Sequence, residues 1–211
     1  MNNSILLFSA SFALLFPLIA GILRFRQQPP LWRTVSIYVC IAAAMEIVCT
    51  LFWLLKRNNL FLLHLYTAAE FGIISLFYAR LFKERLKPWI FPAIMTGFML
   101  LALADAFLIH GLRQFNLYTR ATECILVICY ALFYFYDQLQ QTATPSFGKD
   151  PVFLVNTAFL FYFSCSFFLF LFSNYIIPVS FTQHLLWDMH AVAQWIYYTT
   201  IGFALWKTSA K

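Results

Sequence analysis

Residues 152–173, VFLVNTAFLFYFSCSFFLFLFS, form an almost uninterrupted apolar run that contains no charged residue. An α-helix rises about 1.5 Å per residue, so a run of this length crosses the roughly 30 Å of hydrocarbon in a lipid bilayer. The apolar residues are continuous and do not alternate with polar ones, which favours a helix over a β-strand. A backbone in lipid must also satisfy its hydrogen bonds internally. The run therefore predicts a membrane-spanning helix.

Six further stretches have the same character. Hydrophobic residues make up 63% of the 211-residue chain and charged residues only 10%, against about 25% charged in an ordinary soluble domain. We predict an all-α integral membrane protein, with residues 1–211 forming one domain that is a bundle of seven transmembrane helices. The predicted spans are approximately 5–23, 34–55, 60–82, 89–109, 117–136, 152–173 and 184–206.

The basic residues are distributed unevenly between the two sides of this predicted bundle. Only Lys56, Arg57, Arg113 and Arg120 fall on one side, and the other Lys and Arg residues fall on the opposite side. The positive-inside rule then places the N-terminus outside and the C-terminus in the cytoplasm. The net charge of +6 is thus explained by membrane topology, and we expect no nucleic-acid partner.

Acids and histidines inside the predicted spans are the strongest indication of a functional site. An ionisable side chain in the bilayer costs about 2.5–3.5 kcal/mol even on a lenient scale. Counted from the outer ends of the spans, these residues lie in the outer half of the bundle or near its midplane, which predicts a polar pocket open to the outer face. Asp105 is one of the acids inside the predicted spans. The candidate pocket residues are Glu46, His64, Glu70, Glu123, Asp188 and His190.

Helical phase divides this set. His184 and Asp188 are four residues apart and share a face. His190 lies about 160° away from Asp188 at roughly 100° per residue. Asp188 and His190 therefore cannot both line the same cavity directly. Glu70 is expected to share a face with Tyr66.

Three chemical interpretations remain open for these residues. The first is a zinc site with water in the open position, although no HExxH motif or similarly tight spacing is present. The second is a pocket that senses a ligand or a proton, and the third is structural pairing between helices. Polar pairs between membrane helices contribute only about 0.6 kcal/mol on average, so packing alone is a poor reason for so many ionisable groups. The candidate zinc ligands are His64, His184, Asp188 and His190.

A retinal cofactor is not expected. A Schiff base to retinal needs a lysine midway along the last helix, whereas the predicted span 184–206 contains none and the first lysine after it is Lys207.

Two stretches, residues 59–78 (NLFLLHLYTAAEFGIISLFY) and 153–174 (FLVNTAFLFYFSCSFFLFLFSN), resemble a family of small, uncharacterised seven-span bacterial proteins. This resemblance implies a multi-pass protein of the inner (plasma) membrane.

A looser similarity is to the seven-span zinc hydrolases that include alkaline ceramidases and adiponectin-type receptors. It is carried by Glu70 with Ser75, by Asp105, and by His184 with His190, which are six residues apart. This similarity implies a metal-dependent hydrolase of lipids or amides.

We therefore expect a sensor-like or ligand-binding membrane protein with an outward-facing polar pocket. Its partners would be membrane lipids, a small ligand or lipid, and a cytoplasmic signalling protein that docks on residues 80–87 or 137–151. A zinc-dependent hydrolase is the first alternative and a proton-coupled transporter the second. Whether the protein is an enzyme stays open at this point.

Overall fold

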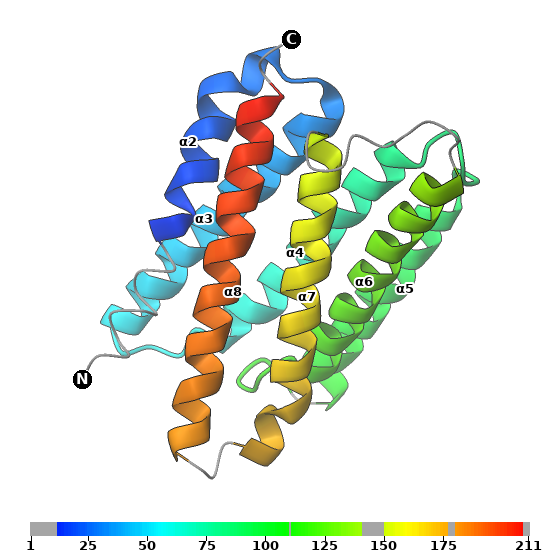
Figure 1. Ribbon diagram of the computed structural model, residues 1–211. Helices are drawn as coiled ribbons and strands as arrows, with labels where there is room; N and C mark the ends of the chain where they lie inside the picture. The colour runs from blue at the N-terminus through cyan, green and yellow to red at the C-terminus, as the bar shows by residue number, and fades with distance from the viewer. Residues whose placement is uncertain (1–11, 110, 141–149, 177–179, 209–211) are drawn as a thin grey trace. The chain divides into compact units, whose positions relative to one another are not determined.

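A computed structural model describes residues 12–109, 111–140, 150–176 and 180–208, and describes only the backbone of residues 171–176, 180–185 and 187. Every regular element in these ranges is helical, and they contain no β-strand, which confirms the all-α prediction (Figure 1). A 3₁₀ turn, Phe25–Gln27, follows α2, and a π-helical turn, Asp105–Ile109, follows α5. The α-helices are α2 (Leu15–Arg24), α3 (Pro30–Leu54), α4 (Leu60–Leu81), α5 (Ile90–Ala104), α6 (Leu117–Gln140), α7 (Pro151–Ile176) and α8 (Ser180–Lys207).

Five segments are long and apolar enough to cross a membrane: Pro30–Leu54, Leu60–Leu81, Ile90–Ile109, Leu117–Gln140 and Pro151–Phe170. They correspond to five of the predicted spans. The described part of α2 is 10 residues long, and α8 is not among the five. The chain is thus a helical protein with several membrane-capable helices, while the count of seven spans and their topology stay predictions.

The contacts between residues divide the chain into two compact units. Unit 1 comprises Met1–Gln28 with Cys124–Lys211, and unit 2 comprises Pro29–Glu123. Helix α6 begins in unit 2 and continues in unit 1. The prediction of one domain over the whole chain stays a prediction.

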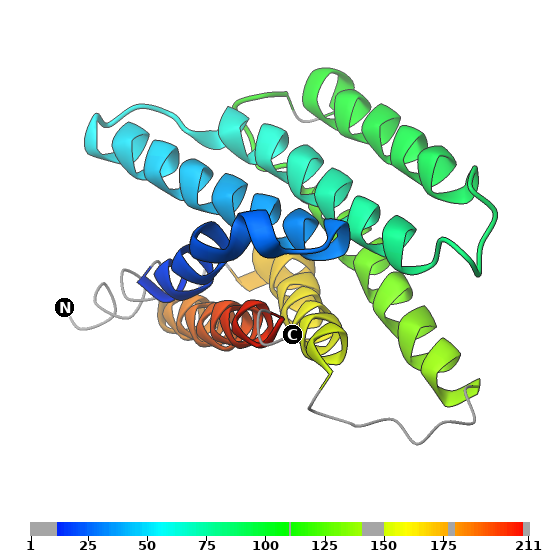
Figure 2. The same ribbon diagram turned by 90° about the horizontal axis from the view of Figure 1, so that it is seen from above.

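In unit 2, α4 lies between α3 and α5 (Figures 1 and 2). Aromatic side chains fill the contact between α4 and α5: the rings of Phe71 and Phe98 are 4.0 Å apart, and Phe82 stacks on both Tyr78 and Phe91. All five of these aromatic side chains are buried. Between helices in lipid such rings stabilise the contact through van der Waals packing, because lipid tails are as apolar as the side chains. This aromatic core therefore packs α4 against α5.

Polar contacts are made at both ends of α4. At one end, Asn58 Oδ1 accepts a hydrogen bond of 2.8 Å from the backbone N–H of Leu60, at the first turn of α4. At the other end, Arg80 donates to the backbone oxygen of Pro30 at 2.6 Å and to Thr34 Oγ1. The start of α3 is thus fastened to the last turn of α4.

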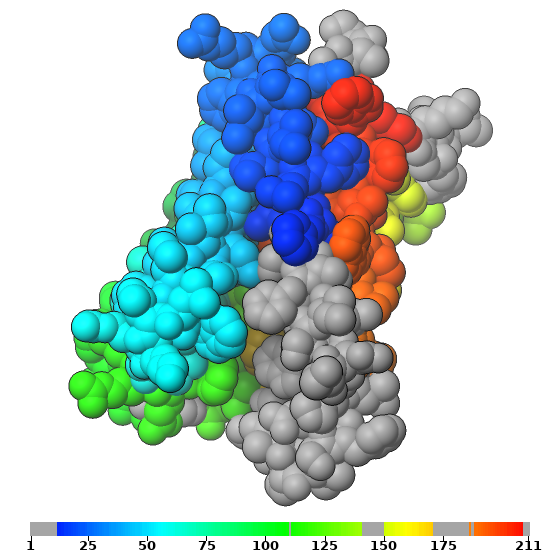
Figure 3. Space-filling model, turned by 90° about the vertical axis from the view of Figure 1, so that its left-hand side faces the viewer, coloured from blue at the N-terminus to red at the C-terminus, as the bar shows by residue number. Residues whose placement is uncertain are grey.

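In unit 1, α8 packs against both α7 and α2. Figure 3 shows α2, in blue, against the C-terminal part of α8, in red. The Arg24 guanidinium lies 4.2 Å from the ring centre of Trp206 and donates to the Trp206 backbone oxygen at 2.7 Å. Between α7 and α8, the rings of Tyr162 and Tyr197 stack at 4.4 Å.

Candidate functional site

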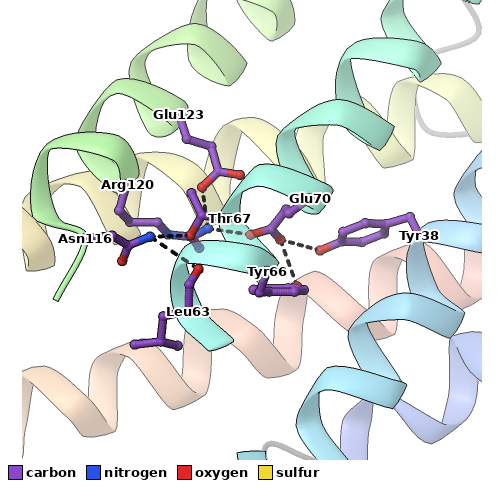
Figure 4. A network of polar contacts seen from close by, with 8 residues as sticks. All are labelled: Tyr38, Leu63, Tyr66, Thr67, Glu70, Asn116, Arg120 and Glu123. Carbon is purple, nitrogen blue, oxygen red and sulfur yellow. Dashed lines mark hydrogen bonds and ion pairs between the residues drawn. The ribbon is translucent and has the colours of Figure 1, made fainter. Parts of the chain in front are cut away.

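Five side chains of unit 2, four of them buried and one half-buried, form a polar cluster, which we call the Glu70 cluster (Figure 4). It draws on three helices: α3, α4 and the first two turns of α6. Its members are Tyr38, Tyr66, Glu70, Arg120 and Glu123.

Glu70 lies at the centre of the cluster and is 1% exposed. Its Oε1 accepts hydrogen bonds from the hydroxyls of Tyr38, at 2.8 Å, and Tyr66, at 3.0 Å. Its Oε2 pairs with Arg120 Nη1. Because Tyr66 and Glu70 are four residues apart on α4, they meet on one helix face, as the sequence predicts. Both carboxylate oxygens of Glu70 therefore have hydrogen-bond donors.

Arg120 is the cation of the cluster and is 7% exposed. Besides Glu70, its Nη1 pairs with Glu123 Oε2 at 2.5 Å, across the three-residue spacing at which side chains of one helix meet. Two carboxylates thus share one guanidinium. With all three groups ionised, their summed charge is one negative unit.

Glu123 is the less satisfied of the two acids. It is fully buried, and no residue in the described ranges donates a hydrogen bond to its Oε1. A buried polar atom without a partner costs about 1–3 kcal/mol, and more when the group is charged. This carboxylate oxygen is therefore an open acceptor position in a cluster that holds two carboxyl groups and one guanidinium.

The segment that leads into α6 is attached to α4. Asn116 Nδ2 donates to Thr67 Oγ1 at 2.8 Å and to the Leu63 backbone oxygen at 3.3 Å. His64 Nε2 lies 3.1 Å from the Gln114 backbone oxygen. A carbonyl oxygen only accepts hydrogen bonds, so Nε2 carries the hydrogen. These contacts set where α6 begins and hence where Arg120 meets α4.

The π-helical turn after α5 makes a second attachment to the start of α6. Asp105, which is fully buried, accepts hydrogen bonds at its Oδ2 from the backbone N–H of Thr119, at 3.2 Å, and from the Thr119 hydroxyl, at 2.7 Å. The first turn of a helix has unpaired N–H groups and a partial positive charge, which stabilise a carboxylate there. Asp105 therefore holds the first turn of α6 in place.

The structure brings together two of the predicted pocket residues, Glu70 and Glu123. His64 lies on α4 and holds the segment before α6, while Glu46 lies on α3, eight residues beyond Tyr38, and is half-buried. Asp188 and His190 lie on α8 in unit 1, where the His190 ring is 5.6 Å from that of Tyr162.

The zinc prediction gains no support from the described side chains. Among them, no three His, Cys, Asp or Glu residues lie close enough together to hold a metal ion. The side chain of His184, one of the four predicted ligands, lies outside the described set. The zinc site stays a prediction.

Sequence reasoning missed Arg120 and Tyr38. The charge distribution places Arg120 among the basic residues that flank the spans, and no sequence pattern distinguishes Tyr38. The spacing of Arg120 and Glu123, three residues apart within one predicted span, could have indicated the ion pair. The bond from Tyr38 depends on how α3 is rotated against α4, which the sequence pattern does not specify.

In chemical terms, the Glu70 cluster can accept a proton or another positively charged hydrogen-bond donor at Glu123. No protein-family model, curated protein or solved structure matches this chain. The resemblance to a bacterial seven-span family is therefore still a prediction.

Proposed function

We propose that this chain is a multi-pass membrane protein of a sensor-like, ligand-binding type, and that the Glu70 cluster is its binding site. The observation that carries the proposal is the open acceptor at Glu123, which is fully buried and belongs to a cluster with two carboxylates and one guanidinium. Ionisable groups inside membrane helices are costly and commonly mark functional sites.

Binding at Glu123 would change more than one residue. A donor at Glu123 Oε1 neutralises part of the charge that attracts Arg120, so that Arg120 pairs more fully with Glu70. Glu70 in turn holds a hydroxyl from α3 and another from α4. A ligand shifts a conformational equilibrium only if it binds one of the two conformations more tightly. A ligand at Glu123 would act on side chains from three helices, α3, α4 and α6.

The proposal includes the topology predicted from the sequence. Seven spans would cross the inner membrane, with the N-terminus outside and the C-terminus in the cytoplasm, and the polar site would open toward the outer face. A cytoplasmic signalling protein would dock on the basic residues 80–87 or on residues 137–151. Membrane lipids would surround the apolar helix faces.

The test compares the wild-type protein with Glu123→Gln in lipid nanodiscs by hydrogen–deuterium exchange. Gln has the shape of Glu without the negative charge, so the variant imitates an occupied site. We expect altered backbone exchange in α3 near Tyr38 as well as in the residues that lead into α6. The matched control is Glu84→Gln, which removes an exposed carboxyl group in the connection after α4. A change confined to the turns of α6 around Glu123, or no change, would show that the cluster is only a local packing device.

A proton-coupled transporter is the second candidate, because the excess buried carboxylate is the kind of group that carries protons in pumps and transporters. Proton flux into liposomes that contain the wild-type protein, Glu46→Gln or Glu70→Gln tests this candidate. Flux that depends on Glu70 would support it, and absence of flux in the wild-type protein would exclude it.

A further inference from the structure

The open acceptor of the Glu70 cluster has a small and well-defined electrostatic environment. The charges that act on Glu123 are those of Arg120, on the same helix, and of Glu70, on α4. The tyrosines from α3 and α4 are neutral hydrogen-bond donors, and both direct their hydroxyls to Glu70. One positive unit added at Glu123 would bring the summed charge of the three ionised groups to zero.

The complete burial of Glu123 limits what can supply that positive charge. Glu123 is fully buried, and its Oε1 has no hydrogen-bond donor among the described residues. An organic ammonium needs space and hydrogen-bond acceptors, and a hard metal ion needs space and several oxygen ligands. A proton needs no cavity, because it forms a covalent bond with the oxygen and becomes part of the side chain.

The distribution of donors indicates which acid takes the proton. The carboxylate of Glu70 has three donors: two tyrosine hydroxyls and Arg120. The carboxylate of Glu123 has one, Arg120, and only at Oε2. Protonation of Glu70 would disturb the hydrogen bonds of two helices, whereas protonation of Glu123 Oε1 disturbs none of those described.

We propose that Glu123 carries an exchangeable proton and that this proton is the ligand of the Glu70 cluster. This inference rests on the proposed function and deepens it, since it names the ligand. In the step itself, hydronium gives a proton to Glu123 Oε1, an O–H bond forms, and water leaves. The cluster changes from one negative unit to neutral, and Arg120 then pairs chiefly with Glu70.

Infrared difference spectroscopy between high and low pH tests the inference on the protein in lipid nanodiscs. We expect a C=O stretching band of a protonated, buried carboxylic acid that appears as the pH is lowered and moves to lower frequency in D₂O. The band should be absent in Glu123→Gln and present in Glu84→Gln, the exposed control. A band that persists in Glu123→Gln but disappears in Glu70→Gln would overturn the inference, as would absence of the band in the wild-type protein.

Glu123→Asp keeps the assignment testable if the Gln variant does not fold. It retains a carboxyl group with a shorter side chain, so the band should remain at a changed frequency. An unchanged frequency would place the proton on a different acid and overturn the inference. The hydrogen-exchange experiment tests the binding site, and the infrared experiment tests the proton. If exchange changes in α3 but no infrared band appears, the Glu70 cluster is still supported as a binding site, and the proton is not its ligand.

Discussion

Replacement of Arg120 by Met gives the most direct test of the Glu70 cluster. Met is an unbranched, uncharged side chain that replaces the apolar stem of Arg, so Arg120→Met removes the cation and keeps the packing of that stem. Glu70 and Glu123 then remain buried, at 1% and 0% exposure, without a neutralising partner. We expect the variant to be strongly destabilised.

The magnitude follows from the burial of all three groups. Removal of one partner from a buried ion pair costs about 3–5 kcal/mol, because a charge is left uncompensated. Each 1.4 kcal/mol is about a factor of ten in an equilibrium constant, so the ratio of folded to unfolded protein should fall by roughly two to three and a half powers of ten. An ordinary polar contact between membrane helices would account for only about 0.6 kcal/mol.

The assay is reversible unfolding in mixed lipid–detergent micelles, titrated with SDS and followed by circular dichroism. Arg113→Met is the matched control, because Arg113 is exposed in the segment before α6, and it should change stability by about 0.5 kcal/mol or less. Neutralising both acids together with Arg120 (Arg120→Met, Glu70→Gln, Glu123→Gln) should recover most of the loss, since replacement of a whole buried ionic group is often nearly neutral. A loss below about 1 kcal/mol for Arg120→Met would refute the reasoning that Arg120 balances the buried acids.

Two further predictions use the same titration. Tyr38→Phe removes a donor to a buried carboxylate and should lower the free energy of unfolding by about 1.5–3 kcal/mol. Tyr66→Phe should lower it by less, because the Tyr66 side chain is only half-buried. Equal losses in the two variants would contradict this prediction. Gly202→Ala places a methyl group where it overlaps the ring of Phe16, so the contact between α2 and α8 should lose about 1–3 kcal/mol. Gly97→Ala is the control, because its added carbon has nothing within 4 Å, and it should be neutral or stabilising by up to about 1 kcal/mol. If Gly202→Ala is equally harmless, the Phe16 ring moves aside freely and the prediction is wrong.

Much of the fold could be predicted from hydrophobic runs alone. The runs at 34–55, 60–82 and 117–136 correspond to α3, α4 and α6 within a few residues at each end, because a continuous apolar stretch of that length has few alternatives in lipid. The π-helical turn at Asp105–Ile109 was not predicted. A hydropathy pattern does not distinguish a π-helical turn from the α-helix it continues, and the hydrogen bonds from Thr119 to Asp105 join two different predicted spans.

The candidate site could be predicted only in part, for a related reason. Glu70 and Glu123 were identified because a charge in an apolar run is conspicuous. Arg120 was not, because it lies near the start of its run, where a basic residue is ordinary in a membrane protein. Tyrosine is also common in such chains, so Tyr38 gave no signal. Which side chains meet is set by helix rotation, and hydropathy contains little information about rotation.

The continuity of α6 has a mechanical consequence. Its first turns carry Arg120 and Glu123. Within unit 1, Asn156 of α7 donates to the Ala131 backbone oxygen at 3.2 Å, and Tyr134 donates to Asp150, the residue before α7, at 3.3 Å. Because α6 is one continuous α-helix, its first turns and the turns that contain Ala131 and Tyr134 share one hydrogen-bonded backbone. A single proline placed between Glu123 and Ala131 would remove a backbone hydrogen bond and kink that helix, at a cost of about 3 kcal/mol or more.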